Sequence, residues 1–529
     1  MDHRAKRVAI VGAGTSGLAA CKHLLARGFR PVVFEAGESV GGLWTRTLAS
    51  TTLQSHTATY RYSDFPWPDS AGAHPRHDQV VDYLAAYSRR FGVDRCVRFR
   101  SRVVAAEYVG DAPEDAADRW ERWAGNGEAF GDGSGAWRLT VSRRSQSETG
   151  PETQEVHEFD FLILCIGMFS GVPNIPAVFP GPEAFRGRVL HSMELSDMAH
   201  ADAAALVKGK RVVVVGSRKS AFEIANDCAG ANGVGTPCTM VCRNPQWMLH
   251  RADVWGGVSL AYLYMNRFAE LMVPRPGASA ASRILAVLLA PVVWAISAAT
   301  GAWYRREIPM REYGMEPGHG FARCVSSCLI SKLPDGFYDR VREGSVVLAR
   351  SKSFGFRHDG LVLDDDKRVV PADVVIFATG FRGDEKLRNM FASPRVRDFI
   401  GASAPLYREC VHPRIPQMAV LGYAGGLSAI YVCEMEAKWV ARLLDRAFRL
   451  PSVRRMEESC AEWGRYYARE SSGGEGQSLG PRLCAVHVWY NDELCRDMGC
   501  DPRRKKIKGQ GLLAEWFQPY SVLDYADIR

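Results

Sequence analysis

One loop near the start of the chain restricts its fold more than any other feature. A short apolar run precedes GAGTSG at 12–17, and PVVFEA follows at 31–36. A strand, a G-x-G-x-x-G turn, a helix and a second strand make up a βαβ nucleotide-binding unit. Gly12 permits the tight turn, Gly14 lets backbone approach a pyrophosphate, and Gly17 allows close helix packing. These residues predict a dinucleotide site.

The strand after this loop ends in an acid, Glu35. A carboxylate at this position accepts hydrogen bonds from the hydroxyls of a ribose that has no 2′-phosphate. GGLW at 41–44 follows closely and predicts a second close approach of backbone to the cofactor. Gly42, Leu43 and Trp44 are therefore candidate contacts. This combination resembles flavoprotein oxygenases more than simple dehydrogenases.

A second strand–turn–helix pattern is VVVVGSRKSAFEIA, residues 212–225. Gly216 ends the valine run, and Ala221 occupies the position of the third small residue of the turn. Arg218 stands where the second glycine is expected. We therefore expect the phosphates to lie slightly off the turn, with Arg218 or Lys219 supplying positive charge. The candidate contacts of this loop are Gly216, Arg218, Lys219, Ser220 and Ala221.

The strand after the second loop, TMVCR, ends in Arg243 and not in an acid. A guanidinium binds a 2′-phosphate in bidentate fashion, whereas a carboxylate would repel it. Glu35 and Arg243 therefore assign FAD to the first loop and NADPH to the second.

The order of elements predicts an α/β protein with two nested Rossmann-like dinucleotide-binding domains, a β-meander insertion and a helical C-terminal extension. We assign residues 1–180 and 350–450 to a discontinuous FAD-binding domain. Residues 181–349 form the NADPH-binding domain, with an inserted apolar segment, and residues 451–529 form the extension.

The composition excludes some classes of function. The net charge of +8 indicates tolerance of anionic ligands, but no motif for binding nucleic acid is present. Fourteen cysteines lack the spacing of a disulfide framework, and CVSSC at 324–328 is neither a redox pair nor a zinc site. We expect reduced, mostly buried thiols, a cytoplasmic protein and no metal.

Two features of the tail are separate from these motifs. SSGGEGQSLGP at 471–481 is typical of a flexible segment. The basic run RRKKIK at 503–508 favours a solvated face over a nuclear-import signal.

The segment at 284–304 carries no charge in 21 positions. A bilayer needs about 20 apolar residues, so the segment is long enough to span one. Pro291, several small residues and the position within the chain favour a buried or membrane-surface helix instead. We therefore expect a peripheral association with the surface of the endoplasmic reticulum. The oligomeric state stays open.

A family resemblance rests on two further motifs. FRGRVLHSMEL at 185–195 resembles the F-x-G-x-x-x-H-x-x-x-[YFW] signature of flavin-containing monooxygenases, with Leu195 in place of the final aromatic. We interpret His191 of this signature as a structural coupler between the domains. FATGF at 377–381 is similar to the family's second marker. It makes Thr379 and Gly380 candidate cofactor contacts.

The resemblance implies an N,N-dimethylaniline-type monooxygenase. In that family NADPH reduces FAD, the reduced flavin takes up O₂ as a C4a-hydroperoxide, and one oxygen passes to a nitrogen or sulfur of a small substrate. Gln54 lies where the family places a polar side chain near the flavin, so it is the candidate catalytic residue. Ser428 begins a helix predicted over 425–448; it either directs backbone N–H groups to the flavin or only caps the helix.

Within the family, residues 53–68 and the long tail look like the plant subgroup that N-hydroxylates pipecolic acid in defence. Two other enzyme classes compete with this interpretation. An S-oxygenase of thioethers remains an alternative, whereas a flavin disulfide reductase would need a cysteine pair that GGLWTRT does not offer. Arg218 and Leu195 also leave open a nucleotide-binding protein that has lost turnover.

Overall fold

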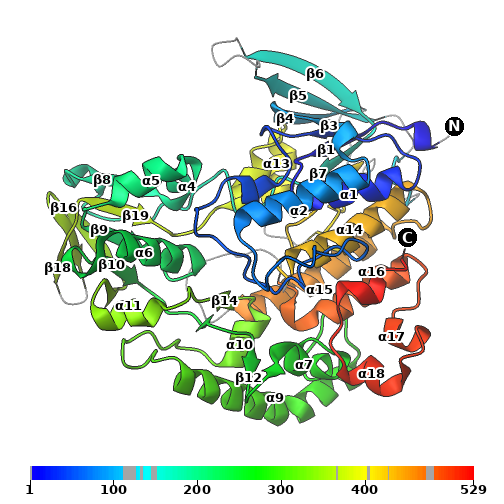
Figure 1. The fold of residues 1–529 in the computed structure, drawn as a ribbon. Coiled ribbons are helices and arrows are strands. Elements are labelled where there is room, and N and C mark those ends of the chain that lie inside the picture. The colour runs from blue at the N-terminus through cyan, green and yellow to red at the C-terminus, as the bar shows by residue number, and fades with distance from the viewer. Residues whose placement is uncertain are drawn as a thin grey trace.

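The computed structural model describes residues 3–110, 127–131, 135–144, 152–364, 367–401, 406–426, 428–471 and 482–528. Two parallel sheets lie beside each other, and a layer of helices from the middle and the end of the chain covers them below (Figure 1). The predicted α/β fold with two nested Rossmann-like domains is confirmed.

The first sheet surrounds the first glycine loop. Its strand order is β20-β7-β1-β2-β3, and all pairings are parallel. β1 lies in the centre with all four residues buried, and α1 (Thr15–Leu25) follows it and packs against α14 (Ala429–Leu444). The strands are β1 Val8–Val11, β2 Val32–Phe34, β3 Val97–Arg98, β7 Phe161–Leu164 and β20 Met418–Val420.

The second sheet surrounds the second loop, in the order β15-β10-β9-β19-β8, again all parallel. The valines of β9 are buried, and α6 (Lys219–Asn232) follows them. The strands are β8 Arg188–His191, β9 Val212–Val215, β10 Cys238–Cys242, β15 Val346–Arg350 and β19 Val374–Phe377. Because β19 pairs between β8 and β9, the second sheet includes residues up to 377. The boundary predicted at residue 350 between the second domain and the rest of the first therefore lies too early in the chain.

A β-meander of three antiparallel strands is inserted into the first unit, as predicted: β4 Ser101–Val109, β5 Ala136–Arg143 and β6 Thr153–Phe159. The long exposed loop expected within 110–158 falls largely on 111–126, 132–134 and 145–151, which lie outside the described residues. A second small antiparallel sheet consists of β16 Phe354–Arg357, β17 Gly360–Leu363 and β18 Val369–Pro371.

The remaining elements are mostly short connections around the sheets. They are α2 His77–Arg90, α4 Ser192–Asp197, α5 His200–Val207, α7 Leu260–Tyr264, α8 Arg267–Leu271, α10 Phe321–Ser326, α11 Phe337–Glu343, α12 Gly383–Arg388, α13 Pro394–Gly401, β11 Met248–Leu249, β12 Asp253–Val254, β13 Val258–Ser259 and β14 Ser331–Lys332.

The C-terminal extension is helical, with α15 Val453–Ser471, α16 His487–Asp497, α17 Arg504–Ile507 and α18 Gly511–Phe517. Its aromatic residues Trp463, Tyr490 and Tyr525 join the hydrophobic core of the first domain. The basic run at 503–508 is the expected solvated face only in part: Arg503, Lys506 and Lys508 are exposed, whereas Arg504 and Lys505 are buried in ion pairs with Asp527 and Asp524. The expected flexible segment lies outside the described residues beyond 471.

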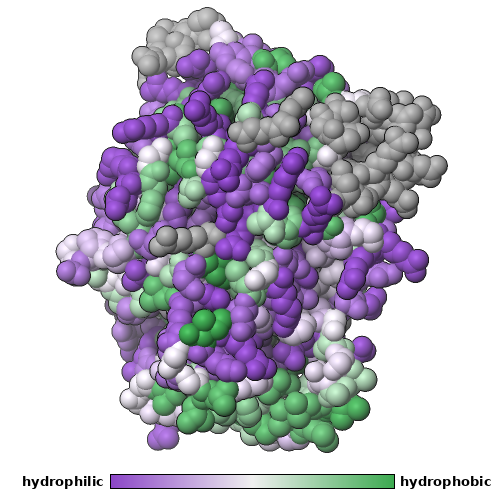
Figure 2. All heavy atoms as spheres, turned by 90° about the vertical axis from the view of Figure 1, so that its right-hand side faces the viewer, coloured by the Kyte–Doolittle hydropathy of each residue, from purple (hydrophilic) through white to green (hydrophobic). Residues whose placement is uncertain are grey.

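The apolar segment forms α9 (Ala280–Glu307), which lies along the outer edge of the molecule (Figure 1). Among the described residues, α9 is the one helix whose length and apolar composition would allow it to cross a membrane. Only 22% of its most apolar window is buried, so a buried core helix is excluded. Apolar side chains gather at this end of the surface (Figure 2).

The cysteines differ from the expectation at one place. Cys328 and Cys484 form a disulfide, with their Cα atoms 5.7 Å apart. The two residues are 156 positions apart, and only the packing of the extension against the end of α10 brings them together. Spacing along the chain could not reveal this pair. Ten of the other twelve cysteines are buried, as expected.

Candidate active site

Both glycine loops open into one cavity of about 3400 Å³. Pockets for single small ligands measure about 300–1,000 Å³, so this one has room for more than one such ligand. All the candidate site residues line it except Gly17 and Ala221, which lie beneath the two loops. The residues on its wall are Gly12, Gly14, Glu35, Gly42, Leu43, Trp44, Gln54, Gly216, Arg218, Lys219, Ser220, Arg243, Thr379, Gly380 and Ser428.

The glycines of the first loop meet different surroundings. A Cβ on Gly12 would lie 2.5 Å from the carbonyl oxygen of Cys165, and one on Gly17 would lie 1.9 Å from that of Gly12. A Cβ on Gly14 would meet nothing closer than the Cα of Gly42, at 3.5 Å. Packing therefore requires glycine at 12 and 17, whereas Gly14 borders the cavity and a Cβ there would make only an ordinary van der Waals contact. The cavity beside Gly14, at the start of α1, fits a pyrophosphate.

Glu35 is held at the edge of the cavity by backbone. Its Oε2 accepts a hydrogen bond from the N–H of Ala13 and its Oε1 one from Gly37, both at 2.7 Å. Each carboxylate oxygen keeps a further lone pair, so the group can still accept from a ribose hydroxyl. The residues of the first loop thus fit a nucleotide with a free ribose.

The two cations predicted for the second loop are not equivalent. Lys219 donates to the carboxylate of Glu223, one turn further along α6, so its charge is largely neutralised. Arg218 is the residue before α6, and its guanidinium has no hydrogen bond or ion pair within the described part of the chain. Burial, and then the like charge of Arg482, lowers its pKa to about 10, so it stays cationic at neutral pH. Arg218 is therefore the better candidate for phosphate.

Beneath the same loop, a Cβ on Gly216 would lie 2.5 Å from the carbonyl oxygen of Ala378 and 3.0 Å from the Cβ of Ala221. The two small residues thus let α6 approach the sheet closely. Arg243 follows β10 directly and is exposed on the cavity wall. Its position at the strand end is the one from which a 2′-phosphate is recognised.

The residues of the signature join two strands of the second sheet. His191 ends β8 opposite Phe377, accepts a hydrogen bond from the N–H of Met193 (3.1 Å) and packs edge-on against Phe381 at 5.2 Å. Burial lowers its pKa. His191 thus joins β8 to β19 and to the segment that follows it, and its role as a coupler between the domains stays a prediction. Leu195 is buried in the core of this domain.

The marker after β19 is tied to the first domain by backbone. The Thr379 hydroxyl donates to the carbonyl oxygen of Asn174, and the N–H of Asn174 donates to the carbonyl oxygen of Gly380 (2.9 Å). The hydroxyl of Thr379 is thus engaged within the protein. A contact of Thr379 or Gly380 with a cofactor therefore falls to the backbone, which at Gly380 has a φ of +85°.

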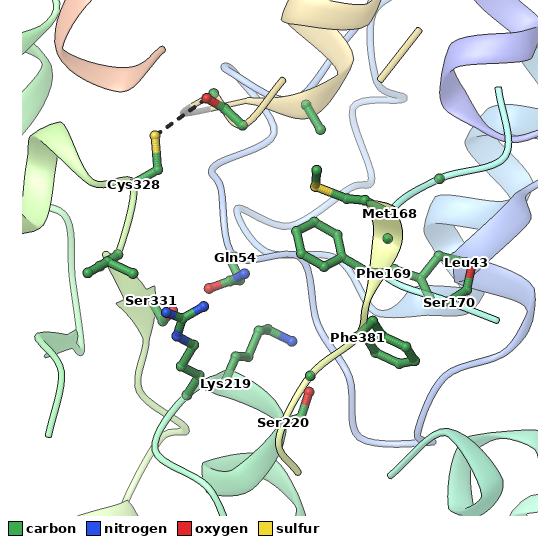
Figure 3. A pocket seen from close by; sticks show the side chains of 18 of the residues that line it. Leu43, Gln54, Met168, Phe169, Ser170, Lys219, Ser220, Cys328, Ser331 and Phe381 are labelled. Atoms are coloured by element: carbon green, nitrogen blue, oxygen red, sulfur yellow. Dashed lines mark hydrogen bonds between the residues drawn. The ribbon is translucent and has the colours of Figure 1, made fainter. Parts of the chain in front are cut away.

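Gln54 projects into the middle of the cavity. Figure 3 shows it between the segment of Cys328 and Ser331 on one side and Phe169 and Phe381 on the other. Its Oε1 accepts a hydrogen bond from the N–H of Lys332 at 3.2 Å. This contact leaves the NH₂ group of the amide as a donor for a ligand.

Two further candidates are held by neighbouring backbone or side chains. Trp44 Nε1 donates to the hydroxyl of Tyr60 at 3.1 Å. Ser428 precedes α14, but its hydroxyl donates to the carbonyl of Thr59 at 2.8 Å and does not cap the helix. Capping by the Ser428 side chain is therefore wrong.

Sequence reasoning missed several residues that line the same cavity. Tyr467 donates to Glu409 at 2.7 Å, and burial raises the pKa of this carboxyl to about 8. Arg323 and Arg482 also reach the wall. These residues come from separate parts of the chain and belong to no local motif, so no signal in the sequence pointed to them.

Comparison with known proteins gives a consistent result. The model of the family described as flavin-binding monooxygenase-like matches residues 5–128 and 132–505. The "Probable flavin-containing monooxygenase 1" of Arabidopsis thaliana is 33% identical, over 98% of this chain and 96% of its own length.

Solved structures share the fold. The complex of OTEMO with FAD and NADP has a TM-score of 0.65 at 17% identity, covering 93% of this chain and 97% of that one. The S-allyl-L-cysteine S-oxygenase of Allium sativum has a TM-score of 0.55 at 17% identity, covering 96% and 92%.

Proposed function

This chain belongs to the flavin-binding monooxygenase-like family, and from that premise we propose that it oxygenates the nitrogen or sulfur atom of a small substrate. Its cofactors are FAD and NADPH. The observation that carries the proposal is the pair of glycine loops with an acid after one and an arginine after the other, both opening into one cavity. One dinucleotide of each kind can meet there.

The residues divide between the two cofactors by charge. Gly14 and Glu35 hold FAD at the start of α1, and Arg218, Ser220 and Arg243 hold NADPH at the start of α6. FAD, once reduced by NADPH, supplies the activated oxygen from O₂. The protein itself positions the groups and excludes water.

Around the reacting centre the chain provides one polar group and an apolar wall. Gln54, held by the N–H of Lys332, offers its amide NH₂ to the nicotinamide cofactor and to the oxygen that is transferred. Phe169 and Phe381 line the cavity opposite and limit water there. No proton relay is needed for transfer to a soft nucleophile, which agrees with the lack of a nucleophile–base pair among the candidate residues.

For the substrate we propose a small amine, with N-hydroxylation of pipecolic acid in plant defence as the first reaction to test. Support comes from the resemblance of residues 53–68 and of the tail to that plant subgroup. Oxygenation of a thioether is the second candidate, because the S-oxygenase of Allium sativum shares the fold.

The test measures NADPH oxidation, O₂ uptake and product mass with the FAD-loaded protein. Pipecolic acid or S-allyl-L-cysteine should accelerate NADPH oxidation and gain one oxygen atom. Gln54→Ala should keep its FAD and lose most product, whereas Gln154→Ala, on the exposed face of β6, should match the wild type. A yellow protein that consumes no NADPH with any amine or thioether would show that turnover has been lost.

We also propose that the protein is cytoplasmic and binds the surface of a membrane, such as that of the endoplasmic reticulum. Support comes from the exposed apolar side of α9 and from Leu512, Leu513 and Phe517 on α18. α8 packs against both helices, so their apolar residues belong to one end of the molecule (Figures 1 and 2).

A further inference from the structure

Three arginines line the cavity from three separate parts of the chain. Arg218 precedes α6 in the second glycine loop, Arg323 lies in α10, and Arg482 follows the end of α15 and pairs by a backbone bridge with Gly425. None of the three guanidinium groups has a hydrogen bond or ion pair to a side chain in the part of the chain that the structure describes. Only Arg218 lies within a sequence motif, the second glycine loop.

Of the three arginines, Arg482 is the one whose surroundings point most clearly to a missing anionic partner. Its side chain is only 6% exposed, and its Nε is buried without a hydrogen-bond partner among the described residues. Burial, and then the like charge of Arg323, lowers its pKa. Glu470 acts in the opposite direction, but its carboxylate also faces Arg469 at 3.7 Å. The local charge around Arg482 is therefore positive.

The three groups interact with one another as well as with the cavity. Arg482 lowers the pKa of Arg218, and Arg323 lowers that of Arg482, so they form a chain of like charges. A buried guanidinium without a partner costs free energy, and like charges side by side add to that cost. Such a cluster is stabilised when an anion with several acceptor oxygens completes it.

We propose that Arg218, Arg323 and Arg482 form an oxyanion-binding subsite, which takes the carboxylate or phosphate group of a ligand in the cavity. The group comes either from an anionic substrate or from NADPH. Arg243 and the start of α6 already face the cavity as phosphate partners, whereas Arg323 and Arg482 lie outside that βαβ unit. The proposal rests on the oxygenase function above, because it concerns a ligand of the same cavity.

The disulfide fixes the two arginines that lie outside the glycine loop. Cys328 follows α10, which carries Arg323, and Cys484 lies two residues after Arg482. The bond therefore holds these two side chains on one wall. Pre-positioned guanidinium groups lose little entropy on binding a planar carboxylate or a phosphate.

Calorimetry on the FAD-loaded protein tests the subsite without requiring turnover. The probes are NADP⁺, 4-(methylthio)benzoate and thioanisole, of which the last two share a thioether and differ by the carboxylate. Arg482→Gln should weaken the binding of the anion that occupies the subsite by about 10–100-fold, which corresponds to the loss of one charge-assisted hydrogen bond. The affinity for thioanisole should stay unchanged. Arg454→Gln, a 90% exposed arginine side chain on α15, is the control.

The pattern of losses identifies the source of the oxyanion. Weaker binding of 4-(methylthio)benzoate alone assigns the subsite to a substrate carboxylate, and weaker binding of NADP⁺ alone assigns it to a phosphate. Changes below about twofold for both anions, or an equal loss for all three probes, overturn the proposal. A protein that binds these probes but oxygenates nothing would refute the proposed function and leave the subsite intact.

Thermal unfolding separates ligand binding from a structural role. Without ligand, Arg482→Gln should unfold at the same temperature as the wild type or higher, because it removes an unpaired buried charge. Arg482→Lys should keep part of the affinity for the anion, since lysine keeps the positive charge and lacks only the planar guanidinium that donates two parallel hydrogen bonds. A clear fall in the Tm of ligand-free Arg482→Gln would show that Arg482 stabilises the fold and does not await an anion.

Discussion

At the scale of single residues, Gly14 and Gly17 of one turn serve different purposes. A side chain on Gly14 enters the cavity, whereas a Cβ on Gly17 overlaps the carbonyl of Gly12. We expect Gly14→Val to fold but to be isolated without flavin absorbance, and Gly17→Ala to fail to fold. Absorbance spectra and circular dichroism distinguish the two, with Gly72→Val, which meets nothing within 4 Å, as control. Stoichiometric FAD in Gly14→Val would contradict the assignment.

Glu409 predicts a dependence of stability on pH. Burial raises its pKa in the folded protein from the ordinary 4.5 to about 8. Between these values only the folded state holds the proton, so the free energy of unfolding falls as pH rises from 4.5 to 8 and levels off above. At about 1.4 kcal/mol per pKa unit the effect of this group amounts to a few kcal/mol. Glu409→Gln should flatten that part of the curve.

The measurement is the Tm of wild type and Glu409→Gln at several pH values from about 4 to about 9, a range that brackets the two pKa values. Glu458→Gln is the control, since Glu458 lies on the exposed side of α15. Parallel curves for Glu409→Gln and the wild type would mean that Glu409 is ionised in the folded protein.

At the scale of elements, what the sequence predicted was local. The strand–turn–helix units around Gly12 and Gly216 and the meander follow from patterns of neighbouring residues. The rest depends on segments that meet only in the fold. β19 returns between β8 and β9 and moves the domain boundary, and Lys505 is buried because Asp524 lies beside it.

The site divides in the same way. The glycine loops and the strand ends that follow them form local motifs, so the sequence alone predicts their residues. Glu409, Arg323 and Arg482 reach the cavity from three distant segments, and each by itself resembles any other charged residue. Even within a motif, the sequence does not show that the charge of Lys219 is neutralised, because this depends on its ion pair with Glu223 in the folded helix.

The disulfide between Cys328 and Cys484 gives a prediction for the C-terminal extension. It closes a long loop and joins the extension to α10, so its loss should lower the free energy of unfolding by about 2–4 kcal/mol. Cys328→Ser should show a lower Tm in the absence of reductant, and the wild type should lose the same amount when reductant is added. Cys500→Ser, at a cysteine outside the disulfide, is the control. Titration of free thiols that counts all fourteen in the native protein would contradict the bond.

At the scale of the whole molecule, the parts are arranged around the cavity and away from α9. The two sheets bring their glycine loops to the cavity, and the extension closes it with Tyr467, Arg482 and Cys484. α9 contacts the protein with one side only: Ser297 accepts from the N–H of Ala322, and Tyr304 donates to backbone carbonyls near β12. Because these contacts hold α9 on the protein at its middle and near its end, the helix is better placed to lie on a membrane surface than to cross a bilayer.

The opposite side of α9 leads to a prediction about membranes. Val287, Leu288 and Trp294 are 68%, 70% and 73% exposed. Burying such a side chain gains about 1.5–3 kcal/mol, so Leu288→Glu combined with Trp294→Glu should weaken binding to phospholipid vesicles by about 10²-fold or more. Co-sedimentation with vesicles measures this, and Val156→Glu on β6, 60% exposed, controls for the added charge.

Extraction with alkaline carbonate distinguishes a surface helix from a spanning one. A protein held by one apolar side of α9 should be released from vesicles, because the hydrogen bonds of Ser297 and Tyr304 keep the other side on the protein. Retention after extraction would mean that α9 leaves these contacts and crosses the bilayer. Unchanged sedimentation of the double variant would place the membrane contact elsewhere. Since α9 and the cavity belong to one folded unit, vesicle binding should leave the affinity for NADP⁺ unchanged.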